Sequence, residues 1–186
     1  MTIEEPKFSL ALKDGALEIR DHVAAIAAEV TVKGTQAEAS RQGFRLLAGY
    51  IFGANSRRQK NAMTAPVTKS AAGEKIAVTA PVTQIPGNSD WLVRFTMPGQ
   101  YRLADLPVPN DPAVKIRAMV PARFAVLRFS GLAGEAKVAK TREQLLSILR
   151  VRGLHPAGPV SIARYNPPWT PWFLRRNEVM ISMAGG

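Results

Sequence analysis

The 186-residue sequence contains no cysteine and only two histidines, His22 and His155. Without thiols the chain cannot form disulfides, thiolate nucleophiles or thiolate-ligated metal centres. Two histidines are also too few for a typical multi-histidine zinc site. The sequence has no Gly-x-Ser-x-Gly elbow, HExxH helix or phosphate-binding glycine loop, and no pair of carboxylates at a spacing useful for catalysis. These absences argue against the common hydrolase, metalloprotease and nucleotide-binding classes.

Long apolar runs are missing as well. None approaches the roughly 18 to 20 residues that a membrane-spanning helix requires. The first seven residues lack both the basic and the apolar region of a signal peptide. From the sequence as it stands, we expect a cytoplasmic protein without a transmembrane segment.

Charge of one sign is in excess, because 25 lysines and arginines outnumber 14 acidic residues and give a net charge of +11. Such a surface attracts anions, including nucleic acids, anionic lipids and ligands that carry carboxylates. The basic residues are nevertheless scattered, and the sequence has neither a recognition-helix signature nor an RNA-binding aromatic pair. We therefore expect no specific nucleic-acid partner.

The pattern of residues predicts strands followed by a helix in the first part of the chain. Residues 16–33 alternate or run apolar as strands do. Thr35 and Glu38 have the spacing of a capping box, and a helix is predicted over 37–52. Its apolar side chains recur at three- and four-residue intervals: Phe44, Leu47, Ala48 and Ile51. The helix is expected to end at Gly53.

Two strand-like segments follow, at 62–69 and 75–84, and each contains Thr-Ala-Pro-Val-Thr. A turn between them predicts a hairpin. Proline cannot donate a hydrogen bond to a strand ladder, so Pro66 and Pro81 each require an edge, a bulge or a strand end. A further strand is predicted at 91–97, and 106–112 is a proline-rich loop.

The second half of the chain repeats features of the first. The matching residues are Val23/Val120, Ala25/Ala122, Ala28/Ala125, Gly34/Gly131, Glu38/Glu135 and Ala39/Ala136. Each half has a strand, a glycine and then a helix, the second helix being predicted over 135–152, with closing strands at 160–165 and 178–183. We predict one α+β domain over residues 1–186, with pseudo-repeats at roughly 16–100 and 113–183.

Three blocks of sequence resemble the SOUL haem-binding family, in particular its bacterial members. They are Leu17-Glu-Ile-Arg20; Gly43-Phe-Arg-Leu-Leu-Ala-Gly-Tyr-Ile-Phe-Gly53 with Ala62-Met-Thr-Ala-Pro-Val67; and Tyr165-Asn-Pro-Pro-Trp-Thr-Pro-Trp-Phe-Leu-Arg-Arg-Asn-Glu-Val179. The resemblance covers about 160 residues. It implies a distorted antiparallel β-barrel built from two strand-helix-strand-strand repeats with two flanking helices. It also implies non-covalent binding of haem or a related tetrapyrrole in a hydrophobic groove beside helix 37–52.

The resemblance also suggests site residues. Arg41 occupies the position of a propionate-pairing arginine, and a guanidinium suits a carboxylate because the two have matching planar geometry. Gly49 and Thr170 stand where relatives have lysines with similar roles, and Asp21 stands where one branch has its axial histidine. The predicted cofactor-binding residues are Arg41, Phe44, Arg45, Leu47, Ala48, Ile51 and Met63, and His22 is the candidate metal ligand.

Each candidate also has a purely structural interpretation. His22 can be an ordinary strand histidine, His155 a loop residue, and Met63 a core residue. Arg41 and Arg45 suit a solvated helix face equally well. For the aromatic cluster Trp169, Trp172 and Phe173 we favour a plug that closes one end of the barrel over a lid or a partner surface.

Three other predictions concern polar groups. We expect Glu178 to pair with an arginine rather than to act as a general base. The hydroxyls of Tyr50 and Tyr165 are predicted to be structural.

We first expect a protein that binds haem as a carrier, buffer or sensor, with no dedicated catalytic site. Haem-dependent peroxidase-like activity would then be a property of the cofactor. The alternatives are an enzyme that acts on a tetrapyrrole or another small substrate, and a small-molecule-sensing interaction module on the same scaffold.

Overall fold

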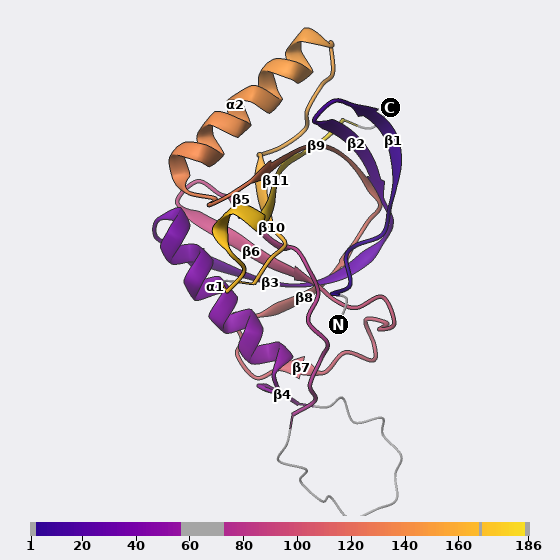
Figure 1. Ribbon diagram of the computed structural model, residues 1–186. Coiled ribbons are helices and arrows are strands. Elements are labelled where there is room, and N and C mark those ends of the chain that lie inside the picture. Colours follow the sequence, from indigo (N-terminus) through magenta and orange to yellow (C-terminus); the bar gives the residue numbers. More distant parts are fainter. Residues whose placement is uncertain (1–2, 57–72, 168, 185–186) are drawn as a thin grey trace, which may run out of the picture.

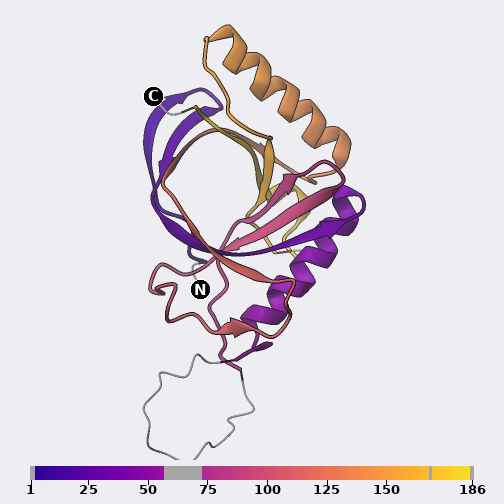
Figure 2. The same ribbon diagram turned by 180° about the vertical axis from the view of Figure 1, so that it is seen from behind.

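The computed structural model describes residues 3–56, 73–167 and 169–184. A nine-stranded antiparallel sheet curls into a half-barrel, and two helices cover its outer face (Figures 1 and 2). The strands, in sheet order, are β1 (Phe8–Asp14), β2 (Leu17–His22), β9 (Ala122–Ser130), β11 (Arg176–Ser182), β10 (Ser161–Arg164), β5 (Val82–Pro86), β6 (Asp90–Thr96), β3 (Ala25–Lys33) and β8 (Lys115–Met119). The helices are α1 (Gln36–Ile51) and α2 (Glu135–Val151), and η1 (Trp172–Leu174) is a short 3₁₀ turn. A small second sheet pairs β4 (Asn55–Ser56) with β7 (Val108–Pro109). The predicted α+β class is confirmed.

Helix α1 begins at the predicted capping box. The Thr35 hydroxyl accepts a hydrogen bond from the Glu38 backbone N–H, and the Glu38 carboxylate accepts one from the Thr35 backbone N–H. The helix ends one residue before Phe52, and Gly53 then adopts a φ of +117°, a conformation that glycine tolerates best. Gly43 lies so close to β6 that an added Cβ would stand 2.5 Å from a methyl of Val93. A glycine is therefore required at this helix–sheet crossing.

Each helix seals a separate apolar core on the outer face of the sheet. Leu47, Tyr50 and Ile51 of α1 pack against β3 and β6, including the fully buried Val93. Helix α2 packs in the same way against β2, β9 and β11: Leu145, Leu149, Leu17, Ile19, Leu127, Val179 and Ile181. Both views show the N-terminal ends of the two helices side by side (Figures 1 and 2).

The inner face of the half-barrel carries the alternate residues of the same strands. A third apolar cluster lies there, formed by Ala80, Phe124, Val126, Ala163, Tyr165 and Met180. The inner face is therefore partly filled with side chains. It also holds the buried charged residues described below.

Several predicted boundaries are confirmed. The strands predicted within 16–33 are β2 and β3, and both predicted helices are present within a residue of their expected bounds. Of the predicted 75–84 strand, only β5 forms, and it begins directly after Pro81, which is the strand end that this proline requires. The predicted strand at 62–69, its hairpin and Pro66 lie outside the described residues.

The order of elements is similar in the two halves of the chain. In the first, β3 leads to α1, β5 and β6; in the second, β9 leads to α2, β10 and β11. The order β9-β11-β10 on one side of the sheet mirrors β3-β6-β5 on the other, and β10 pairs with β5 where the halves meet. That these halves are equivalent repeats stays a prediction. In the part of the chain that the structure describes, no helix is long and apolar enough to cross a bilayer.

Candidate functional site

The predicted ligand-binding residues of α1 point in two directions. Leu47 and Ile51 are 0% and 1% exposed and belong to the core beneath the helix. Arg41 and Arg45 are exposed on the opposite side, whereas Phe44 lies at the flank of the helix, partly exposed and in contact with the buried Phe95. The structure therefore divides the predicted set into residues that anchor α1 and residues that a ligand on its outer face can reach.

An apolar strip runs along the outer face of α1. Phe44 is 44% exposed, and its ring meets the buried Phe95 ring edge-on with 5.5 Å between centroids. Ala48 follows one turn later and is partly buried, and Phe52 at the helix end is 61% exposed. Phe52 was not among the predicted residues, although its four-residue spacing from Ala48 places it on the same face. We call Arg41, Phe44, Arg45, Ala48 and Phe52 the α1 strip.

Two residues of the α1 strip, Arg41 and Arg45, carry guanidinium groups. Neither Arg41 nor Arg45 forms a salt bridge with a residue that the structure describes. The pKa of Glu38 is lowered mainly by its hydrogen bonds with Thr35, and Arg41 lowers it further through its charge. Both arginines can therefore pair with an incoming anion without first breaking a salt bridge to a described residue.

A shallow hollow of about 160 Å³ lies beside the C-terminal half of α1. Arg45, Gly49 and Tyr50 line it from the helix, and Pro109, Asp111 and Val114 line it from the opposite segment. This volume is below the range of roughly 300 to 1,000 Å³ typical of enclosed ligand sites. A planar ligand at α1 would therefore lie on the surface, with one edge at this hollow. The predicted contact Met63 lies outside the described residues.

His22 lies on the other face of the sheet from α1. Along β2, Leu17 and Ile19 point to the outer core, so Arg20 and His22 point inward. The imidazole of His22 lies between the rings of Phe8 and Phe124, each 5.3 Å away between centroids. Because the sheet separates them, His22 and the α1 strip cannot contact the same haem.

The environment of His22 favours a neutral ring. Burial lowers its pKa, and the nearby positive charge of Arg20 lowers it further. Its Nε2 is buried and has no hydrogen-bond partner among the described residues. No group of three or more histidines, aspartates or glutamates in the described part of the chain is arranged to hold a metal ion. His22 as a metal ligand stays a prediction, and it would serve a site separate from α1.

A buried ionic network occupies the inner face next to His22. Glu178, which is 0% exposed, accepts hydrogen bonds from Arg20 at 2.8 and 2.9 Å and from Arg176 at 3.1 and 2.9 Å. The Tyr165 hydroxyl donates a further one at 2.7 Å. Glu18 also pairs with Arg20. The expected pairing of Glu178 with an arginine is confirmed, but Arg20, 158 residues away in sequence, was missed because no local pattern links the two.

These groups are poorly suited to acid–base chemistry. Burial alone would raise the pKa of Glu178, but the hydrogen bonds and charge of Arg20 outweigh it and lower that pKa. Burial and the neighbouring carboxylate raise the pKa of Tyr165. The carboxylate thus stays ionised and the phenol stays protonated near neutral pH. Like Tyr50, whose hydroxyl donates to the Pro107 carbonyl at 3.0 Å, Tyr165 serves a structural role, as predicted.

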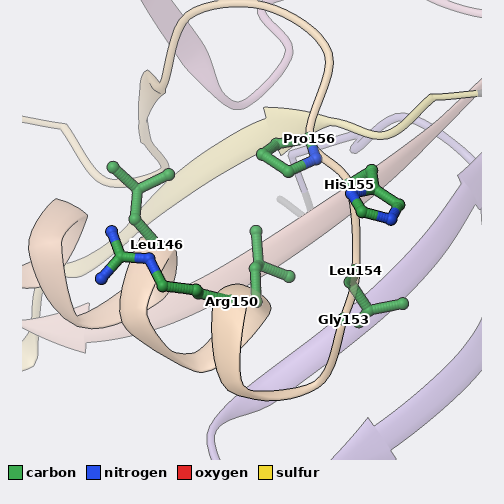
Figure 3. Close-up of a pocket in the computed structure, with 7 residues that line it drawn as sticks. Leu146, Arg150, Gly153, Leu154, His155 and Pro156 are labelled. Atoms are coloured by element: carbon green, nitrogen blue, oxygen red, sulfur yellow. The ribbon is translucent and has the colours of Figure 1, made fainter.

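A second hollow, of about 320 Å³, lies at the C-terminal end of α2 (Figure 3). Leu146, Leu149 and Leu154 form part of its lining, together with Gly153, Pro156, Arg150 and the exposed His155. The side chains of Arg150 and His155 extend in different directions (Figure 3). Polar groups therefore do not converge on a common point in this hollow.

The aromatic cluster near the C-terminus does not form the predicted plug. Trp169, Trp172 and Phe173 are 82%, 61% and 59% exposed. The plug prediction is wrong: Trp172 and Phe173 are exposed on the 3₁₀ turn η1 and Trp169 is exposed ahead of it, while Ala163 of β10 and Met180 of β11 pack in the neighbouring core.

Comparison with known proteins identifies relatives over nearly the whole chain. The family model of the SOUL heme-binding proteins matches residues 3–182. Heme-binding protein 1 of Xenopus laevis is 30% identical over 175 residues, which cover 90% of this chain and 84% of that protein.

Solved structures with low sequence identity share the fold. The EcmrR C-terminal domain superposes with a TM-score of 0.64 at 8% identity, covering 91% of this chain and 98% of that one. A structure described as a hydrolase from Listeria innocua has a TM-score of 0.58 at 12% identity, covering 94% of each chain. At such identities the likeness concerns architecture alone.

Proposed function

The chain belongs to the SOUL heme-binding protein family, and from this relationship we propose that it binds haem or a related tetrapyrrole non-covalently on the α1 strip. The observation that carries the proposal is the strip itself, in which exposed apolar side chains stand beside two arginines without salt bridges to described residues. A haem combines an apolar ring with two propionates, and the strip offers a partner for each part.

The apolar part of the strip suits the porphyrin face. Phe44 already rests on Phe95, so its ring is held in place before a ligand arrives. Aromatic contacts of this kind favour offset or edge-on geometry and add to the free energy of apolar burial. Phe52 and Ala48 would extend the contact along the helix. Leu47 and Ile51, which anchor the helix in its core, would support this surface from beneath.

The charged part of the strip suits the propionates. Arg41 and Arg45 lie one turn apart on α1, so their guanidinium groups can reach two carboxylates on the same ligand edge. Each pair would form charge-assisted hydrogen bonds, which are stronger than neutral ones. The hollow next to Arg45 would receive the edge of the ring.

Iron ligation on this face would be weak. Helix α1 contains neither histidine nor methionine, so the helix itself offers no axial ligand, and Met63 stays a predicted contact of the cofactor. When bound, haem would supply redox and peroxidase-type chemistry of its own. The residues of the chain would bind and orient it, which fits a carrier, buffer or sensor better than an enzyme with selected catalytic groups.

The test is a haem titration of the purified protein followed by Soret absorbance. We expect saturable one-to-one binding, weakened about three- to tenfold by Arg41→Ala or Arg45→Ala and about tenfold by Phe44→Ala. Arg142→Ala is the matched control, because Arg142 is an exposed arginine on α2. His22→Ala should leave the spectrum unchanged, whereas Met63→Ala should alter it.

Two results would overturn the proposal. One is haem binding no tighter than that of an unrelated basic protein. The other is an equal loss in the Arg41 and Arg142 variants, which would show that net charge alone drives the association.

A further inference from the structure

Five large apolar side chains lie exposed on two neighbouring loops. Four of them belong to the segment that precedes β11, and the fifth follows β9. They are Trp169, Trp172, Phe173, Leu174 and Leu132, with exposed fractions of 82%, 61%, 59%, 63% and 59%. We call these residues the aromatic patch.

Hydrogen bonds hold the two loops side by side. The backbone N–H of Gly131 donates to the Arg175 carbonyl at 3.3 Å, and the Asn177 side chain donates to the Gly131 carbonyl at 2.8 Å. A Cβ added at Gly131 would stand 4.0 Å from the Trp172 ring. Leu132 therefore lies next to the turn that carries Trp172, although it precedes Trp169 by 37 positions in the sequence.

The patch is presented by an ordered turn. The Leu174 N–H donates to the Pro171 carbonyl at 3.0 Å, and the Arg175 guanidinium donates to the Thr170 carbonyl at 2.8 Å. The rings of Trp172 and Phe173 meet edge-on with 5.7 Å between centroids. These bonds fix the backbone of the turn on which the exposed Trp172 and Phe173 stand. Large apolar side chains gathered on the surface in this way often mark a contact surface.

Basic residues outnumber acidic ones among the sequence neighbours of the patch. Arg128 is exposed near the end of β9, Lys137 is exposed in the first turn of α2, and Arg175 adjoins the turn. Glu135 is the acidic residue nearest Leu132 in sequence. The whole chain carries +11. Tryptophan and phenylalanine on a turn with basic neighbours are typical of proteins that insert shallowly at the headgroup level of anionic bilayers.

We propose that the aromatic patch docks the protein reversibly on anionic lipid membranes. The tryptophan, phenylalanine and leucine side chains enter the interfacial region, while the surrounding lysine and arginines contact anionic headgroups. Because the patch carries its rings on a turn rather than along a groove or sheet edge, it suits a fluid lipid interface better than a shaped protein partner. The proposal is independent of haem binding on the α1 strip.

The test is co-sedimentation with vesicles of equal parts phosphatidylcholine and phosphatidylglycerol. We expect the wild-type protein to bind, with tryptophan emission shifting to shorter wavelength, and to bind less as salt increases. The double variant Trp169→Ser, Trp172→Ser should lose about tenfold or more of this affinity. The matched control is Val120→Ser, Val151→Ser, which removes two side chains that are 78% and 85% exposed elsewhere. It should bind as the wild type does.

Unchanged thermal unfolding of both double variants would confirm that they fold. Absence of wild-type binding, or equal binding by the tryptophan variant, would overturn the proposal. So would equal binding to pure phosphatidylcholine vesicles at all salt concentrations. Sedimentation equilibrium that shows a dimer dependent on Trp169 and Trp172, without vesicle binding, would assign the patch to a second copy of the chain instead.

Discussion

Glu178→Gln is expected to destabilise the protein strongly, because this carboxylate neutralises two arginines inside the half-barrel. Glu178 is 0% exposed and Arg20 is 3% exposed. Five hydrogen bonds from Arg20, Arg176 and Tyr165 converge on its two oxygens. A glutamine would turn an NH₂ group toward donors that it cannot satisfy and would leave both guanidinium groups short of a counterion.

The expected loss of unfolding free energy depends on the counterions that Arg20 and Arg176 keep after the substitution. Breaking a buried ion pair by removing one partner typically costs about 3 to 5 kcal/mol. Arg20 would keep Glu18, and Arg176 would keep the partly exposed Glu5. We therefore expect the lower end, about 3 kcal/mol of unfolding free energy at neutral pH. Replacing Arg20 and Glu178 together by methionine should cost less than the sum of the single replacements, because neither charge is left alone.

The loss should also depend on pH in a defined direction. The pKa of Glu178 is lowered from its ordinary 4.5 in the folded protein. Its contribution is therefore complete above about pH 4.5 and is lost as the pH falls through the lower folded-state value. The gap in stability between wild type and Glu178→Gln should narrow below pH 4.5.

Urea unfolding followed by circular dichroism, at several pH values, measures both effects. Asp21→Asn is the control, because Asp21 pairs with Arg123 on the surface, where the side chains are 39% and 49% exposed. A loss for Glu178→Gln no greater than that for Asp21→Asn would refute the reasoning. A gap that stays constant down to acid pH would refute its electrostatic part.

Three further outcomes are expected from the same unfolding assay. The wild-type protein should lose stability below about pH 6.5, because burial lowers the pKa of His22 and the unfolded chain binds the proton first. His22→Phe should remove this loss, whose slope is at most about 1.4 kcal/mol per pH unit. An unchanged slope in the variant would contradict a buried neutral ring. Gly43→Ala should lower the free energy of unfolding by about 1 to 3 kcal/mol, because it forces α1 away from Val93. Gly49→Ala should be neutral or stabilising, because its added Cβ would meet nothing nearer than 3.9 Å. Equal effects of the two variants would show that the close helix–sheet approach is unimportant. Tyr165→Phe should cost about 1.5 to 3 kcal/mol, because it removes a hydroxyl that donates to a buried carboxylate at 2.7 Å; no loss would mean that the arginines alone satisfy that oxygen.

Local features of the fold were predictable from the sequence. The capping box at Thr35 and Glu38, the apolar spacing in α1 and the strand end after Pro81 each depend on neighbours within a few residues. Such signals survive in almost any tertiary context. The pairing of Glu178 was predictable in kind, because a buried glutamate beside arginines requires a counterion.

The candidate site was predictable only in part. The sequence placed Phe44, Leu47 and Ile51 on one helix, but which of them face a ligand depends on where β6 crosses beneath α1. Phe52 was missed although it lies within the helix predicted over 37–52; in the structure it is the C-cap that follows Ile51. The prediction that Trp169, Trp172 and Phe173 plug the barrel was wrong, because composition does not reveal whether a core has room for their rings.

The sequence by itself determined the helices, most strands, the α+β class and the family, since these follow from periodicity, capping and ordered blocks of residues. Only the tertiary structure decided that His22 and α1 lie on opposite faces, that Arg20 meets Glu178, and that Trp169 and Trp172 face solvent. The physical reason is that alternation along a strand determines which side chains share a face of the sheet, but not whether that face becomes the outer or the inner one. That is decided when distant strands pair, the sheet curls, and the helices cover one side of it.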